Sequence, residues 1–196
     1  MKVIGLCGGS GSGKGYISHL FLQYGIPTLD TDAVYRTLTA GPSPCVSELS
    51  ARFGATVVGK DGGLDRAALR GIIFGDKNAT AQKLALLNRI THKYIWKETE
   101  KWLQAQRQAG TKVVLIDAPV LYESGFDRAC EAVIAVLCPA EERRRRIMSR
   151  DGLDSESAQR RMDAQMPDEE LVGRADYCIR NGPQDQPGMQ VSALAM

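Results

Sequence analysis

The stretch Val3-Ile4-Gly5-Leu6-Cys7-Gly8-Gly9-Ser10-Gly11-Ser12-Gly13-Lys14 joins a short apolar run to a glycine-rich turn that ends in lysine. Glycines let the backbone curl tightly, so that successive N–H groups point inward at an anion. The helix expected over residues 14–24 would add the positive end of its dipole, and Lys14 would add a full charge. The spacing Gly8-(four residues)-Gly13-Lys14 is that of a P-loop and predicts binding of a nucleoside triphosphate. The alternative interpretation is a flexible N-terminal turn.

The last position of this motif departs from the P-loop pattern, which asks for Ser or Thr where this chain has Gly15. The missing hydroxyl normally ligates Mg²⁺ beside the phosphates. Because Mg²⁺ prefers six oxygens and readily keeps waters, a water can take the vacant position. We therefore expect weaker Mg²⁺ binding and slower turnover, with ATP binding retained. The expected ATP-binding residues of the loop are Gly8, Gly9, Ser10, Gly11, Ser12, Gly13, Lys14 and Gly15.

Length and composition fit one domain, residues 1–196, with room for a small lid. Hydrophobic residues make up 43% and charged residues 24%, as in ordinary globular proteins, and the net charge of +2 does not favour nucleic-acid binding by the whole molecule. No apolar stretch approaches the roughly 20 residues that span a bilayer, so we expect no membrane partner. We also expect no signal peptide, reduced and mostly buried cysteines, and a cytoplasmic location.

Apolar runs alternate with helical spacing along the chain. Strands are predicted at residues 2–7, 27–30, 112–116, 132–137 and 177–179. Helices are predicted at residues 14–24, 33–39, 44–53, from 66 after a capping Asp65, 79–109, 140–149 and 155–164. The tail after Asn181, rich in Gly, Pro and Gln, is expected to be loose. The alternation predicts an α/β fold, a parallel sheet between helical layers, with ligands at the carboxyl ends of the strands.

Acidic residues follow two of these predicted strands. Asp30 and Asp32 come after the second, where a carboxylate can accept the proton of an incoming hydroxyl or help to hold Mg²⁺. Asp32 can alternatively cap the helix that follows. Asp117 ends the run Val113–Ile116 and is expected to orient the metal through water, although strand-end aspartates also form turns.

A run of arginines, Arg143–Arg146 followed by Arg150, lies on the predicted helix over residues 140–149 and just beyond it. Such a run is usually a solvated helix face. Phosphoryl transfer, however, needs cations around the transferring group, and arginine binds phosphate through two donors at once. We expect part of the run to face solvent, and we prefer Arg146, Arg150 and Arg161 for active-site roles. His92 is interpreted as structural rather than catalytic.

Motifs spread over nearly the whole chain resemble the dephospho-CoA kinase family, the P-loop enzymes that complete coenzyme A synthesis. Beyond the P-loop, the matching stretches are Asp30-Thr31-Asp32, Arg66–Leu69 to Ile73-Phe74, Leu87–His92, Asp117–Glu123, Arg146–Asp151, and Arg161 through Gln165-Met166-Pro167 to Ala175-Asp176-Tyr177, Ile179 and Asn181. The P-loop is shared by many nucleotide-binding proteins. The segments over residues 117–123 and 165–181 are far more selective.

The resemblance implies a P-loop kinase core, a helical CoA-binding part at about residues 64–102, and an arginine-bearing lid at about residues 140–165. It implies transfer of the γ-phosphate of ATP to the ribose 3′-hydroxyl of dephospho-CoA, with Mg²⁺ as cofactor. Asp32 would be the base, Lys14 would neutralise the phosphates, and Arg146 would act with them. Arg150, Arg161 and Asn181 would bind ATP, and closure of the lid would exclude water.

Three positions depart from the family pattern, namely Gly15, Lys93 in place of a proline, and Leu171 where a basic residue is frequent. Two alternatives therefore stay open: another small-molecule or nucleotide kinase, and a nucleotide-binding protein impaired by Gly15. Nucleic-acid binding through the arginine run is weakly supported, because the run has no interleaved aromatics and acidic residues surround it.

Overall fold

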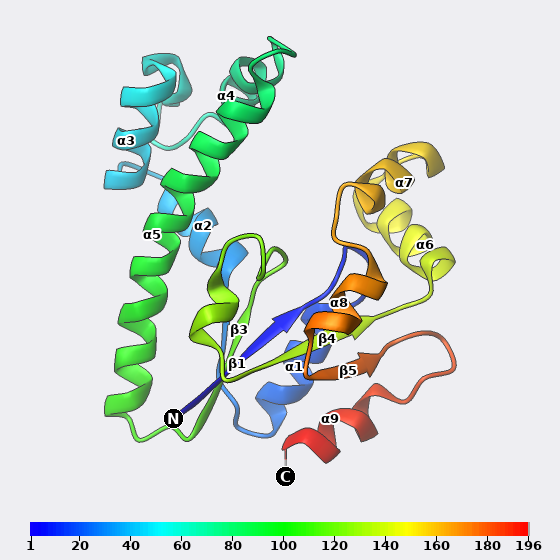
Figure 1. Cartoon of the computed structure of the whole chain (residues 1–196). Helices are drawn as coiled ribbons and strands as arrows, with labels where there is room; N and C mark the ends of the chain where they lie inside the picture. Colours follow the sequence, from blue (N-terminus) through cyan, green and yellow to red (C-terminus); the bar gives the residue numbers. More distant parts are fainter. Residues whose placement is uncertain (196) are drawn as a thin grey trace. The chain divides into compact units, whose positions relative to one another are not determined.

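One parallel sheet of five strands runs in the order β2-β3-β1-β4-β5 (Figure 1). The strands are β1 (Lys2–Cys7), β2 (Thr28–Asp30), β3 (Val113–Asp117), β4 (Ala132–Leu137) and β5 (Tyr177–Arg180). The central strands are nearly continuous apolar runs, as expected for a parallel sheet that is covered on both faces. Because β1 is the middle strand, the glycine-rich turn that follows it begins at the centre of the sheet.

The structure, a computed structural model, describes residues 1–195 and divides into two compact units. The first unit contains Met1–Asp30 and Gln106–Met196 and holds the whole sheet. Its helices are α1 (Lys14–Gln23), α6 (Ala140–Asp151), α7 (Ser155–Asp163), α8 (Asp168–Arg174), α9 (Pro187–Ala195) and the short 3-10 helix η2 (Phe126–Ala129).

Helices α1 and α9 pack against one face of this sheet. The buried cluster that they form with the strands consists of Leu6, Ile17, Phe21, Leu115, Ile134, Val136, Ile179 and Val191. On β1, a Cβ at Gly5 would lie 2.7 Å from Cδ2 of Leu121. The glycine therefore lets the segment after β3 pack directly on the strand, which helps to hold that segment beside the end of β1.

The second unit, Thr31–Ala105, is helical. It contains α2 (Thr31–Thr39), α3 (Pro44–Phe53), the 3-10 helix η1 (Ala55–Val57), α4 (Arg66–Phe74) and most of α5 (Thr80–Gln108). The side chains of Ser43 and Asp65 cap α3 and α4, and the cap by Asp65 was predicted from the sequence. Helix α5 passes through Lys93 without a break, and Lys93 forms an ion pair with Glu48 of α3.

The predicted α/β fold with a parallel sheet is confirmed, and the predicted strands and helices lie within a few residues of their expected bounds. Helix α2 begins at Thr31, two residues earlier than expected, so Asp32 lies inside its first turn and does not cap it. The expectation of a loose tail is wrong, because residues 187–195 form α9. Burial of Val191 in the core outweighs the low helix propensity of Gly188. Helix α8 was not predicted; its Leu171 is buried.

The described residues contain no helix that combines the length and apolar character needed to cross a bilayer. All five cysteines are free thiols, and Cys7, Cys45 and Cys138 are buried. Burial raises the pKa of the Cys7 thiol to about 12, which keeps it protonated and unreactive.

Candidate active site

The glycine-rich turn links the end of β1 to the start of α1. Gly11 and Gly13 have φ angles of 78° and 85°, a left-handed conformation that side chains disfavour. A Cβ at Gly13 would also lie 2.1 Å from Nδ2 of Asn181. Glycine is thus required here both by the backbone conformation and by the close approach of another segment. The turn is tightly curved, with the N–H of Ser12 donating to the carbonyl of Gly9 at 3.0 Å, as is typical of a phosphate-binding loop.

Lys14 and Asp117 form an ion pair beside this turn. Lys14 opens α1, and Asp117 ends β3, the strand next to β1; Asp117 is only 4% exposed. Asp30 is the register partner of Asp117 on β2. The structure therefore brings the predicted lysine and one predicted metal-binding acid together, with a second acid on the adjacent strand.

The carbonyl groups on the outer side of the turn accept hydrogen bonds from two predicted site residues. Nη1 of Arg146 donates to the carbonyl oxygens of Gly11 and Ser12 at 3.3 and 3.4 Å, and Nη2 donates to the carbonyl of Asn181 at 3.0 Å. Nδ2 of Asn181 donates to the carbonyl of Ser12 at 2.8 Å. Arg146 and Asn181 thus lie at the phosphate loop, against its back.

Two further residues at the loop were not singled out from the sequence. Nε of Arg143 donates to the carbonyl of Ser10 at 3.0 Å, and Oε1 of Gln165 accepts the N–H of Ser10 at 2.7 Å. The spacing of Arg143 and Arg146, one helical turn apart, was a signal for Arg143. Gln165 was visible only as part of a family motif.

Arg150 and Arg161 have a different environment. Both form ion pairs with Asp151, and their side chains are 60% and 47% exposed. The hydrogen bond from Arg150, with smaller effects of both arginine charges, lowers the pKa of Asp151. Their predicted contact with ATP stays a prediction.

Asp32 lies in the second unit, exposed in the first turn of α2. The peptide link between Asp30 and Thr31 joins the two units, so the candidate base follows directly on the strand that carries Asp30. Its role stays a prediction.

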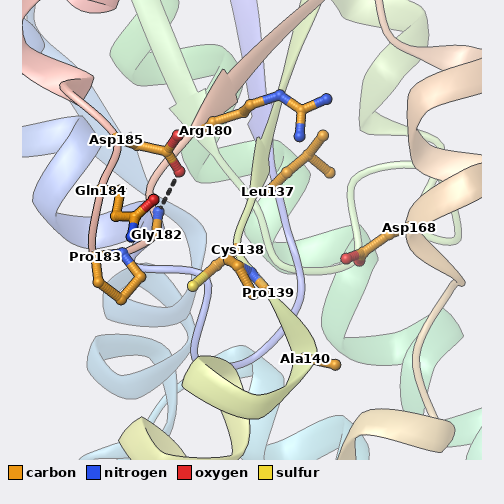
Figure 2. A pocket seen from close by; sticks show the side chains of 10 residues that line it. All are labelled: Leu137, Cys138, Pro139, Ala140, Asp168, Arg180, Gly182, Pro183, Gln184 and Asp185. Carbon is orange, nitrogen blue, oxygen red and sulfur yellow. Dashed lines mark hydrogen bonds between the residues drawn. The ribbon is translucent and has the colours of Figure 1, made fainter.

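A pocket of about 520 Å³ lies in the first unit between the end of β4 and the turn after β5 (Figure 2). It is lined by residues 137–140 and 182–185, together with Asp168 and Arg180. Oδ2 of Asp185 accepts the N–H of Gly182 at 2.6 Å and holds this turn (Figure 2). Gly182 directly follows Asn181, so the pocket adjoins the phosphate loop. Its volume is in the range that small-molecule ligands occupy.

A second cavity, of about 40 Å³, is bounded by Gly8 and Gly9, the segment 119–123 and residues 164–166. The hydroxyl of Tyr122 is buried and has no hydrogen-bond partner within residues 1–195. Burial raises its pKa to about 12, and the guanidinium of Arg174 lies 4.0 Å from the centre of its ring. The segment after β3 thus supplies an unsatisfied polar group close to the loop.

No cluster of three or more His, Cys, Asp or Glu side chains that would hold a metal occurs in residues 1–195. The oxygen donors present, Asp117 and Asp30 at neighbouring strand ends, are nevertheless of the kind that Mg²⁺ prefers. Mg²⁺ commonly binds one or two carboxylates, with substrate phosphates and waters completing its shell. The site fits that mode of binding.

The parallel sheet, the phosphate loop after β1 and the acid at the end of β3 define the chain as a P-loop protein. A family model described as Dephospho-CoA kinase matches residues 2–186. The dephospho-CoA kinase of Syntrophotalea carbinolica is 40% identical to this chain, over 99% of this chain and 90% of the relative. The dephospho-CoA kinase of Corynebacterium glutamicum is 38% identical, over 92% of this chain and 91% of the relative. The solved structure of TT1252 from Thermus thermophilus is 31% identical, with a TM-score of 0.82 over 99% of this chain and 95% of that one.

The chain belongs to the dephospho-CoA kinase family and is therefore a kinase of the P-loop fold. The expectation drawn from its motifs is confirmed. The alternative of a kinase for another small molecule is not favoured by relatives that match along nearly the whole chain.

Proposed function

We propose that this chain transfers the γ-phosphate of ATP to the ribose 3′-hydroxyl of dephospho-CoA, giving coenzyme A and ADP. The observation that carries the proposal is the Lys14–Asp117 pair at a glycine-rich loop, in a chain that matches the family from residue 2 to residue 186. Such an enzyme acts on metabolites of the cytoplasm, where we expect this protein to work.

The phosphates of ATP occupy the loop, where inward N–H groups and the N-terminus of α1 stabilise their negative charge. Lys14 adds its charge to the outer phosphates, which requires its ammonium group to be shared between Asp117 and ATP. Arg146 adds its positive charge at longer range, from the α6 side, where its guanidinium bonds the carbonyls of Gly11 and Ser12 and pairs with Glu142. These groups stabilise the charge that spreads over the oxygens of the transferring phosphoryl group.

Asp32 accepts the proton of the acceptor hydroxyl. Two peptide links separate it from Asp30, so their Cα atoms are at most about 7 Å apart. Asp30 is in turn the strand partner of Asp117, which pairs with Lys14. Chain connectivity thus supports a place for Asp32 close to the phosphate loop.

Asp117, with Asp30 beside it, would hold Mg²⁺ jointly with the phosphates. Bound Mg²⁺ supplies positive charge that neutralises the β- and γ-phosphates. Gly15 offers no hydroxyl for this purpose, so water would be needed in its place.

The nucleoside end of ATP occupies the 520 Å³ pocket after β4, because Asn181 and Gly182 connect that pocket to the loop. Residues 140–165, with Arg150 and Arg161, act as the lid. The helical segment 64–102 in the second unit binds the acceptor. Exclusion of water by closure keeps ATP from being hydrolysed.

The test is ADP release by the purified chain with Mg-ATP, with dephospho-CoA as acceptor and adenosine and the nucleoside monophosphates as controls. Among these acceptors, we expect ADP release only with dephospho-CoA. Preference for a control acceptor would refute the proposed substrate. ATP binding without transfer to any acceptor would instead identify an impaired nucleotide-binding protein.

A further inference from the structure

Arg143 is a buried arginine to which the proposed mechanism gives no role. It lies in the first turns of α6 and is only 6% exposed. Its Nε donates to the carbonyl of Ser10, and its Nη1 donates to Oδ1 of Asp168 at 2.7 Å. Because burying a guanidinium costs free energy unless its donors are satisfied, these contacts distinguish Arg143 from a solvated surface arginine.

The phosphate loop is shaped to receive this side chain. A Cβ at Gly9 would lie 2.0 Å from Nη2 of Arg143, and a Cβ at Gly11 would lie 2.5 Å from the Arg143 carbonyl oxygen. A larger residue at Gly9 would displace the Arg143 guanidinium, and one at Gly11 would push the α6 backbone away from the loop. The glycines thus permit two things at once, the curvature of the loop and its support from behind.

Asp168 extends the contact to the pocket proposed for the nucleoside. It begins α8, pairs with Arg143, and also lines the 520 Å³ pocket. One ion pair therefore spans the distance from the pocket wall to the carbonyl of Ser10. The two ends of a single nucleotide would lie on either side of this pair.

We propose that Arg143 is a positioning residue that holds the phosphate loop in its ATP-binding shape, with Asp168 fixing the guanidinium. This inference rests on the proposed binding of ATP by the loop. Arg143 bonds the carbonyl of Ser10, and the N–H of Ser12 donates to the carbonyl of Gly9 at 3.0 Å, so the turn is held in one conformation before ATP arrives. Without that support the free loop has more conformations, and the entropy lost when ATP orders it makes the binding free energy less favourable.

The chain provides a matched control one residue further along α6. Arg144 forms its ion pair with Glu141, whose side chain is 80% exposed, at the surface of the same helix. Arg143→Met and Arg144→Met remove the same charge from the same helix, and only the first removes a contact with the loop.

The experiment measures the dissociation constant of ATP by calorimetry, together with KM for ATP, KM for dephospho-CoA and kcat, in both variants. Loss of hydrogen bonds from a charged group is expected to weaken ATP binding by about tenfold in Arg143→Met. KM for dephospho-CoA should not change in Arg143→Met, and Arg144→Met should keep the wild-type dissociation constant for ATP. Arg143→Lys, which keeps the charge but cannot bond Ser10 and Asp168 as a fork, should recover only part of the affinity.

Asp168→Asn provides a milder change that keeps the shape of the side chain. It should weaken ATP binding by a smaller factor, and it should add nothing in the Arg143→Met background if the two residues act as one unit. Wild-type affinity for ATP in folded Arg143→Met or in Asp168→Asn, with only thermal stability lowered, would overturn the inference. Failure of the wild-type chain to bind ATP would instead refute the proposed function.

Discussion

Gly15 lies in the first turn of α1, and a Cβ added there would meet no atom within 4 Å. The backbone at this position is helical rather than left-handed, so a serine fits without strain. We predict that Gly15→Ser lowers the Mg²⁺ concentration needed for half-maximal activity by up to about tenfold, the equivalent of about 1.4 kcal/mol. The measurement is a Mg²⁺ titration of ADP release at saturating ATP and dephospho-CoA.

Gly15→Ala is the control for this substitution, because it restores helix propensity without adding an oxygen. If the alanine variant gains as much as the serine variant, the effect belongs to the helix and not to the metal. Equal Mg²⁺ dependence in all three proteins would show that a water fully replaces the hydroxyl.

Asp32 can be tested at the same scale, since an exposed aspartate in the first turn of a helix can be replaced without disturbing the core. We predict that Asp32→Ala slows phosphoryl transfer by about 10²- to 10⁴-fold, the usual contribution of a general base, while ATP still binds. Single-turnover transfer and calorimetric titration of ATP measure the two effects separately. Full activity in the variant would remove Asp32 as the base.

Among the elements, α6 has one face that contacts the phosphate loop and another that carries surface ion pairs, and its sequence alone does not tell the two faces apart. Arg143 and Arg146, one turn apart, contact the phosphate loop, whereas Arg144 and Arg145 form surface ion pairs with Glu141 and Glu142. Helical periodicity predicts which arginines share a face. Which face is turned inward follows only from the packing of α6 against the phosphate loop.

Helix α4 illustrates an element whose start is encoded locally. Oδ1 of Asp65 accepts the N–H groups of Ala67 and Ala68 at 3.0 and 2.9 Å. We predict that Asp65→Ala lowers the free energy of unfolding by about 1 kcal/mol, as expected for loss of an N-cap. Urea denaturation followed by circular dichroism measures this change. Asp65→Asn keeps a capping oxygen and should stay close to wild type; equal losses in both variants would contradict the capping role.

At the scale of the whole molecule, stability is expected to depend on pH through His92. Burial lowers the pKa of His92 in the folded protein. Below the ordinary histidine pKa of about 6.5, the unfolded chain takes up a proton that the folded chain resists. The contribution of neutral His92 to the free energy of unfolding is therefore fully present above that pH and is lost as the pH falls below it.

Urea unfolding at a series of pH values between about 7.5 and 5.5 tests this prediction. The free energy of unfolding of the wild-type chain should decline more steeply than that of His92→Gln over this interval. Parallel curves would mean that protonation of His92 does not contribute to the pH dependence of the free energy of unfolding.

Local sequence determined much of this protein, because the physics involved acts over a few neighbouring residues. The glycine spacing before Lys14 specifies a phosphate loop, the apolar run before Asp117 specifies a buried strand, and Ser43 and Asp65 specify helix starts. The order of strands and helices was enough to predict the parallel sheet, and the resemblance of longer motifs, above all residues 117–123 and 165–181, indicated the dephospho-CoA kinase family.

Only the tertiary structure decided which distant residues meet. Arg143 of α6 and Gln165, between α7 and α8, contact the phosphate loop, and Asp168 of α8 pairs with Arg143. Ser10 and Gln165 are 155 residues apart in the sequence, so no local pattern predicts their contact. The tail, which was predicted to be loose, forms α9 because Val191 is buried in the core. Propensity acts within a segment, whereas burial and the pairing of buried polar groups depend on what the rest of the chain brings alongside.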